Sequence, residues 1–300
     1  MTRLIAILFT MITLSSAEAD MRHYAERFTH HSTLLGEVRQ YSVYLPEGYQ
    51  QQPQQHFPVL YLLDGEKFLL EVAGITQALR AGLNPAIPPL IIVAVHNTDR
   101  MRDYTPSHTL VLPNGAPAGA GYAKTGGGPA FMEYLTRELR PLIERDYRTA
   151  SPALLVGHSL GGLLTLDAVA RDSGQFQGYI AIDASLWFDY PANYQRIERA
   201  LLAPLKHPPR CLSLWPTTPS RRDLVDPSFT GISCGSLPAA WRRAPVTTCT
   251  SPAATSRKKT TTLSITWRSI KGCSSCFGAT DWIWPRASSA GRLSSPTTRP

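Results

Sequence analysis

One stretch of the chain decides the fold: Leu154-Leu155-Val156-Gly157-His158-Ser159-Leu160-Gly161-Gly162. It matches G-x-S-x-G, in which a serine occupies a sharp strand-to-helix turn and small residues on either side let the backbones pass. A chance pentapeptide in a Gly-rich loop is the alternative, but an apolar strand pattern precedes this serine and an apolar helical pattern follows it. We therefore predict Ser159 as a nucleophile at the carboxyl edge of a sheet. The N–H of Leu160, which starts the helix, is a predicted oxyanion donor.

Buried strands and amphipathic helices alternate on both sides of this turn. Continuous apolar runs cover 58–63, 90–95 and 178–183, and the residues between the first two runs have helical spacing. Another helix is predicted over 129–145, with a kink at Pro141. Strands of this kind are buried on both faces, so we predict an α/β fold built on a doubly wound, mainly parallel sheet.

Charge is distributed unevenly along the chain. The formal net charge is +8, yet residues 1–200 hold 16 Lys/Arg against 19 Asp/Glu, and residues 201–300 hold 14 against 3. All five cysteines also lie beyond residue 200. The basic character therefore belongs to the tail, and it does not indicate a nucleic-acid partner for the rest of the chain.

The amino terminus has the features of a secretory signal. An apolar run, Leu4 to Leu14, follows Thr2-Arg3 and precedes the small-residue site Ala17-Glu18-Ala19. We predict cleavage after Ala19 and export to the periplasm or medium. The run is too short for a stable membrane anchor. The predicted organisation is a signal peptide over 1–19, a core over 20–205 and an aberrant basic, largely disordered tail over 206–300.

Several motifs together resemble one family. They are PVLYLLDG (58–65), RMRDYTP (100–106), Gly128-Pro129 before a helix, GHSLGG (157–162) and Ser185-Leu186-Trp187. Over residues 25 to 200 the chain resembles the putative-esterase family of α/β-hydrolases, which contains esterase D and the ferric-siderophore esterases. The resemblance implies a serine esterase acting on a small-molecule ester, with the backbone at Gly65 and Glu66 as the other half of the oxyanion hole. The chain departs from the family at 183–185, which reads Asp-Ala-Ser in place of Ser-Pro-Ser. No cofactor or metal is expected.

The catalytic triad is incomplete in the sequence. In this fold the order along the chain is Ser, acid, His, and Asp183 or Asp189 is the candidate acid. His207 alone follows the nucleophile, 48 residues on, in a Pro-rich segment with no clear strand before it. We predict an exposed loop histidine there, and His158 is expected to point away from the serine.

Residues at the ends of strands are candidates for substrate binding. Arg100 and Arg102 follow one strand, and Trp187 follows another. If an arginine faces the cleft, an anionic substrate is favoured; solvated surface charges are the alternative.

The tail has an unusual composition, with 29 Ser/Thr and five Trp in residues 211–300. A shift of one nucleotide in the reading frame accounts for it better than a stalk or a nucleic-acid arm. Under that shift 258–277 becomes compatible with a histidine ahead of Leu-Tyr-x-Gly-Leu, the segment that carries the catalytic His in the resembling esterases. The alternative is a genuine basic extension, and with it a non-catalytic secreted protein that binds a polyanion through the tail.

Overall fold

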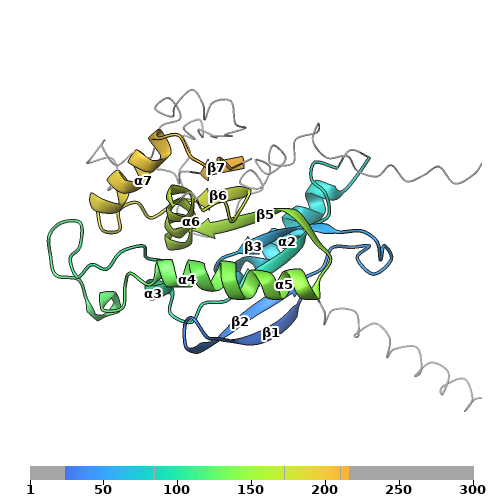
Figure 1. Ribbon diagram of the computed structural model, residues 1–300, viewed down its shortest axis with the longest axis horizontal. Helices are drawn as coiled ribbons and strands as arrows, with labels where there is room; N and C mark the ends of the chain where they lie inside the picture. The colour runs from blue at the N-terminus through green and yellow to red at the C-terminus, as the bar shows by residue number, and fades with distance from the viewer. Residues whose placement is uncertain (1–23, 84, 172, 210, 216–300) are drawn as a thin grey trace, which may run out of the picture.

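The computed structural model describes residues 24–83, 85–171, 173–209 and 211–215. The expected signal peptide and all of the tail beyond Trp215 lie outside these residues. Within them the chain forms one sheet of seven strands in the order β1-β2-β4-β3-β5-β6-β7 (Figure 1). The strands are β1 (Glu26–Ser32), β2 (Glu37–Tyr44), β3 (Phe57–Leu62), β4 (Ile91–Val95), β5 (Thr149–His158), β6 (Gly178–Ile182) and β7 (Cys211–Trp215).

The sheet is mainly parallel. β1 pairs with β2, and β2 with β4, in antiparallel fashion, whereas the other four pairings are parallel. Every residue of β3, β4 and β6 is buried. Continuous apolar runs are typical of parallel strands that helices cover on both faces, and the predicted doubly wound α/β architecture is confirmed.

Helices cover the two faces of this sheet (Figure 1). Even-numbered side chains of β3, β4 and β5 pack with α2 (Gly65–Arg80). Odd-numbered side chains of the same strands pack with the helices of the opposite face. Those helices are α4 (Gly128–Tyr134), α5 (Arg140–Asp146), α6 (Leu160–Ala170) and α7 (Ala192–Leu202). The alternation follows from the two-residue period of a strand.

The helix predicted over 129–145 is continuous but irregular before its proline. Between α4 and α5 the segment η2 (Leu135–Leu139) is a π-helix. Pro141 has no N–H, so the carbonyl of Arg137 cannot receive the usual α-helical hydrogen bond. A local change of helix type is one way in which a helix accommodates such a loss.

The sheet continues past residue 205, where the sequence predicted the end of the core. β7 lies beyond it and pairs in parallel with β6 over five residue pairs, from Gly178–Cys211 to Ile182–Trp215. Leu212 is 1% exposed and belongs to the larger apolar core. The alternation of Leu212 and Leu214 was hidden by the tail composition that surrounds it. β1 and α7 were also not predicted.

None of the helices within the described ranges has the length and apolar character that a bilayer crossing requires.

Candidate active site

Ser159 lies on the turn between β5 and α6, at the carboxyl edge of the sheet. Its backbone has φ 57° and ψ −116°. Its N–H donates to the carbonyl of Ile182 at the end of β6, and its carbonyl accepts from the N–H groups of Leu163 and Ser185. A serine with positive φ, held by hydrogen bonds between a strand and a helix, has the geometry of a nucleophile elbow.

Gly157 is required by the close approach of two backbones. A Cβ built on it would lie 2.2 Å from the carbonyl oxygen of Gly161 and 2.7 Å from Oγ1 of Thr165. At Gly162 a Cβ would lie 2.8 Å from the carbonyl oxygen of Ile182. The packing of α6 against the ends of β5 and β6 therefore requires glycine at 157 and 162, whereas a Cβ on Gly161, the other small residue of the motif, would meet only ordinary contacts at 3.4 Å or more.

Two helices begin beside each other at this edge. α6 begins at Leu160 and α2 at Gly65, and the first N–H groups of a helix have no acceptor within it. An added Cβ on Gly161 would lie 3.6 Å from Oδ2 of Asp64, the residue before α2. Gly65 has no room for a side chain because a Cβ would lie 2.5 Å from the backbone of Ala94. The backbone groups predicted as oxyanion donors thus meet at one end of the sheet.

The carboxylate of Asp64 is buried at this edge and accepts three hydrogen bonds. Asp64 is 1% exposed, and its carboxylate accepts two hydrogen bonds from Arg100, at 2.6 and 2.9 Å, and one from Asn97 at 2.7 Å. Its own N–H donates to the hydroxyl of Tyr104 at 2.9 Å. Asn97 also donates to the carboxylate of Glu66 at 2.6 Å. Asp64 lies in the motif of residues 58–65, but no sequence pattern predicted a role for it.

Among the described residues, Ser185 places its hydroxyl against that of Ser159. The two hydroxyl oxygens, Oγ of Ser159 and Oγ of Ser185, are 2.9 Å apart, and the N–H of Ser185 donates to the carbonyl of Ser159 at 3.1 Å. Ser185 is 3% exposed. The turn that departs from the family pattern therefore still supplies a serine beside the nucleophile.

The two candidate acids occupy the same turn after β6. Asp183 and Asp189 both have positive φ, 48° and 53°. Oδ2 of Asp183 lies 3.8 Å from Nε2 of His158, whereas Asp189 accepts a hydrogen bond from Ser107. Burial lowers the pKa of His158 below its ordinary value, although Asp183 acts in the opposite direction.

No described histidine hydrogen bonds to Ser159. His96 contacts Ser42, His108 contacts Thr125, and the ring of His158 packs against Phe68. The imidazole of His207 lies against Gly174, which precedes β6 and so belongs to the amino edge of the parallel sheet. A strand of five residues separates that edge from Ser159 by roughly 17 Å. Among the described residues, the recorded hydrogen bond of the Ser159 hydroxyl is therefore with Ser185 and not with an imidazole.

Both arginines proposed for substrate binding are engaged within the protein. Arg102 pairs with Glu37 and with Asp103, at 2.7 Å to the latter, and Arg100 pairs with Asp64. The expectation that one of them offers a charge to an anionic substrate is not supported by these contacts. Trp187 is 40% exposed and packs edge-on against Phe188, whose ring stacks on Tyr122.

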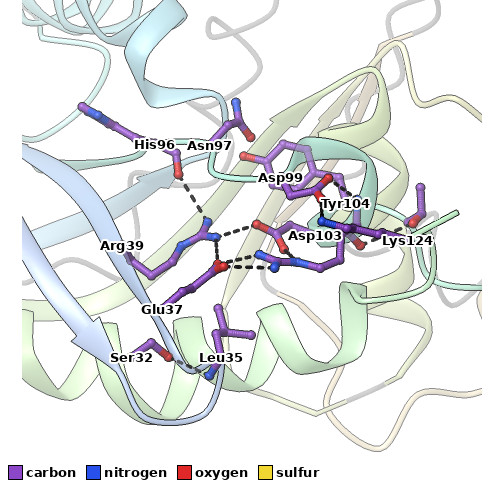
Figure 2. Close-up of polar contacts among 12 residues, drawn as sticks. Ser32, Leu35, Glu37, Arg39, His96, Asn97, Asp99, Asp103, Tyr104 and Lys124 are labelled. Carbon is purple, nitrogen blue, oxygen red and sulfur yellow. Dashed lines mark hydrogen bonds and ion pairs between the residues drawn. The ribbon is translucent and has the colours of Figure 1, made fainter. Parts of the chain in front are cut away.

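A wider network holds the short helix α3 (Arg100–Asp103), which carries Arg100. Figure 2 shows the guanidinium of Arg39 between the carboxylates of Glu37 and Asp103 and the carbonyl of His96. Arg39 is fully buried and also lies over the rings of Phe131 and Tyr134. This network ties α3 to β2 and to α4.

A left-handed serine on a strand-to-helix turn, at the carboxyl edge of a mainly parallel sheet, defines the α/β-hydrolase class. Within that class the family model described as Putative esterase matches residues 32–213, and the chain belongs to this esterase family.

The relatives include siderophore esterases. The ferri-bacillibactin esterase BesA of Bacillus subtilis is 31% identical over 168 residues, which cover 52% of this chain and 57% of the relative. The siderophore triacetylfusarinine C esterase of Aspergillus fumigatus is 30% identical over 138 residues, 44% of this chain and 45% of the relative. The chain thus spans about half the length of the curated relatives it matches.

Solved structures show the same architecture. The crystal structure of an IroE-like serine hydrolase from Shewanella oneidensis has 43% sequence identity and a TM-score of 0.60, and the match covers 63% of this chain and 60% of that one. The BES protein from Bacillus cereus has 27% identity and a TM-score of 0.53, with 64% and 74% covered.

Proposed function

We propose that this protein descends from, and retains the core of, a serine-dependent carboxylic-ester hydrolase with Ser159 as its nucleophile. One observation carries the proposal: a left-handed Ser159 stands at the start of α6, beside the start of α2. Family membership supports the same reaction class. The hydroxyl would attack an ester carbonyl, expel the alcohol and form an acyl-enzyme, which water then hydrolyses.

Charge develops on the carbonyl oxygen during that attack. We assign its stabilisation to the N–H of Leu160 and to the N–H groups of Gly65 and Glu66, because free N–H groups at helix starts attract negative charge. Removing one oxyanion donor typically costs about 10²–10³ in rate. These backbone groups need no side chain, so the assignment does not depend on residues beyond the described ranges.

The hydroxyl also needs a base, and a carboxylate to orient that base. We propose that a histidine of the tail took the proton from the serine hydroxyl and passed it to the departing alcohol, and that a shift of reading frame has removed this histidine. The family match runs to residue 213 and β7 runs to Trp215. The DNA should therefore be searched for an inserted or missing base after the codon for Ser213.

The substrate we propose is a small ester of the siderophore type, because the curated relatives with assigned activities act on siderophores. We also propose export, from the leader-like sequence of residues 1–19. Asp183 and Asp189 remain the candidates for the acid within the described chain, and Trp187 remains the candidate for substrate contact.

The first prediction concerns turnover of a short-chain aryl ester. The chain as encoded should show little activity, because loss of the histidine alone costs nearly as much as loss of the whole triad. The frame-restored chain should be active, and Ser159→Ala in that chain should abolish activity. The measurement is the initial rate of alcohol release at saturating ester.

An ordinary enzymatic rate in the unrestored chain, dependent on Ser159, would show that a discounted histidine is the base, and His207→Ala would be the next variant. The net charge of +11 over residues 201–300 favours a second candidate function, binding of a polyanion. Heparin or DNA binding with a steep salt dependence, unchanged by Ser159→Ala, would support that function instead.

A further inference from the structure

We infer that Arg100 is a positioning residue, which fastens the amino end of α2 to the nucleophile elbow. It would thereby fix the separation between the two proposed halves of the oxyanion hole. The inference rests on the proposed function, and it replaces the idea that Arg100 binds an anionic substrate.

The first observation concerns Asp64, the N-cap residue of α2. Its backbone is left-handed, with φ 54° and ψ 40°, a conformation that costs an L-residue roughly 1–2 kcal/mol. Asp64 is 1% exposed, and Arg100 binds both of its carboxylate oxygens, through Nε and through Nη2. Without that cation the buried carboxylate would lack its charge partner, and the turn would lose its main restraint.

The second observation is that the same guanidinium reaches the elbow. Nη2 of Arg100 donates to the carbonyl oxygen of His158 at 3.2 Å, and His158 is the residue before the nucleophile. The guanidinium also lies over the ring of Tyr104, 5.3 Å from its centroid, and Tyr104 receives the N–H of Asp64. One side chain therefore contacts the segments that precede both helix starts.

Geometry, more than charge, explains why this residue is an arginine. A guanidinium donates from fixed directions and binds a carboxylate through two parallel bonds, which an ammonium group cannot reproduce. Its charge is already balanced by Asp64. A shift of about 1 Å in catalytic groups can cost about 10²-fold in rate, so a bridge that fixes two helix starts affects the reaction without touching substrate.

The position of Arg100 is itself fixed from outside the site. Asp99 caps α3 by accepting from the N–H of Arg102 at 3.1 Å. At the other end of α3, Asp103 accepts from the buried Arg39 at 2.7 Å (Figure 2). The ion pair that holds α3 on β2 is thus separate from the hydrogen bonds that Arg100 makes to Asp64 and His158. Different substitutions can remove the two sets of contacts.

The first test measures covalent labelling of Ser159 in the full-length chain as encoded, with imidazole in the buffer as an external base and a neutral alkyl fluorophosphonate as the probe. Arg100→Ala should lower the maximal labelling rate about tenfold or more, with little change in the probe concentration at half-maximal rate. The maximal labelling rate of Arg100→Lys should fall between those of the wild-type chain and Arg100→Ala. Arg171→Ala, which removes an exposed partner of Asp167 at the far end of α6, is the matched control and should label at the wild-type rate.

An anionic fluorophosphonate separates the two roles of Arg100. A positioning role lowers the labelling rate equally for both probes, whereas a substrate-binding role changes half-saturation for the anionic probe alone and would overturn the inference. Wild-type labelling in the Arg100 variants would overturn the inference but leave the proposed function standing. A frame-restored chain that is never labelled, when tested beside its Ser159→Ala variant, would overturn both.

Hydrogen exchange supplies a readout that needs no activity, and it applies to Arg100→Lys even if Arg100→Ala does not fold. Peptides over residues 63–68 and 157–162 should both exchange faster in Arg100→Lys and remain unchanged in Arg171→Ala. Faster exchange in one of the two peptides, or in neither, would contradict a bridge between them.

Discussion

At the scale of single residues, Ser159 keeps a backbone conformation that few residues other than glycine adopt. It persists because hydrogen bonds to Ile182, Leu163 and Ser185 hold the turn from both sides. Gly157 makes the turn possible, since the helix that follows passes within van der Waals contact of its α-carbon. A methyl group added at this position would clash with the backbone of Gly161 in α6.

Gly157→Ala should therefore destabilise the protein by about 3 kcal/mol or more, the upper part of the range for overpacked sites, because the clash is with backbone atoms that cannot rotate away. The measurement is urea unfolding followed by circular dichroism. Gly74→Ala is the matched control: it lies within α2, where an added Cβ meets nothing within 4 Å. That change should stabilise the protein by about 0.5–1 kcal/mol. Equal effects of the two substitutions would contradict the packing described at the elbow.

At the scale of secondary-structure elements, the irregular segment after β4 is ordered by buried charge. Arg39 on β2 is fully buried and pairs with Asp103, which is 1% exposed. Asp103 also accepts from Nε of Arg102, and Arg102 returns to Glu37 on β2. Hydrogen bonding from Arg102, opposed by burial and assisted by Arg39, lowers the pKa of Glu37. The network holds α3 against the sheet, and Met101 is the one apolar side chain of α3 that packs on the core beside it.

Arg39→Met should cost about 3–5 kcal/mol, because removing one partner of a buried ion pair leaves the other uncompensated. The free energy of unfolding in urea measures it. Arg137→Met, which removes a surface partner of Glu133 with both side chains more than half exposed, should produce no measurable change. A loss below about 1 kcal/mol for Arg39→Met would show that the network contributes little to holding α3.

At the scale of the whole molecule, β7 closes the described sheet on one side. It covers the edge of β6, and Leu212 enters the core that α6 and α7 share with the strands. Residues 211–215, which were expected to belong to a largely disordered tail, therefore form a strand of the sheet. For residues beyond Trp215 the disordered tail stays a prediction.

Two truncations test that division. A chain that ends after Pro216 keeps every described strand and should unfold within about 1 kcal/mol of the full chain. A chain that ends after Pro209 loses β7, bares the edge of β6 and should lose about 2 kcal/mol or more, since burying one leucine is worth about 1.5–3 kcal/mol. Urea unfolding of both distinguishes them. A large loss in the longer truncation would show that the tail packs on the core after all.

The sequence was sufficient for the fold class and for the strand-to-helix turn at Ser159, because both depend on local patterns. Apolar runs of strand length and helical spacing predict buried parallel strands and their covering helices. The glycines around Ser159 indicate a close backbone approach within a single turn. β7 was missed because five alternating residues carry little signal inside a segment of unlike composition.

Only the tertiary structure brings together the side chains around Ser159 and at the start of α2. Asp64 and Arg100 lie 36 residues apart, and Ser159 and Ser185 lie 26 apart; no local period relates either pair. They meet because parallel strands end at one edge of the sheet, and the order of strands, fixed by packing, determines which ends are neighbours. Arg100 follows the end of a strand, where the sequence predicted a contact with substrate, and only the fold brings it to the buried carboxylate of Asp64.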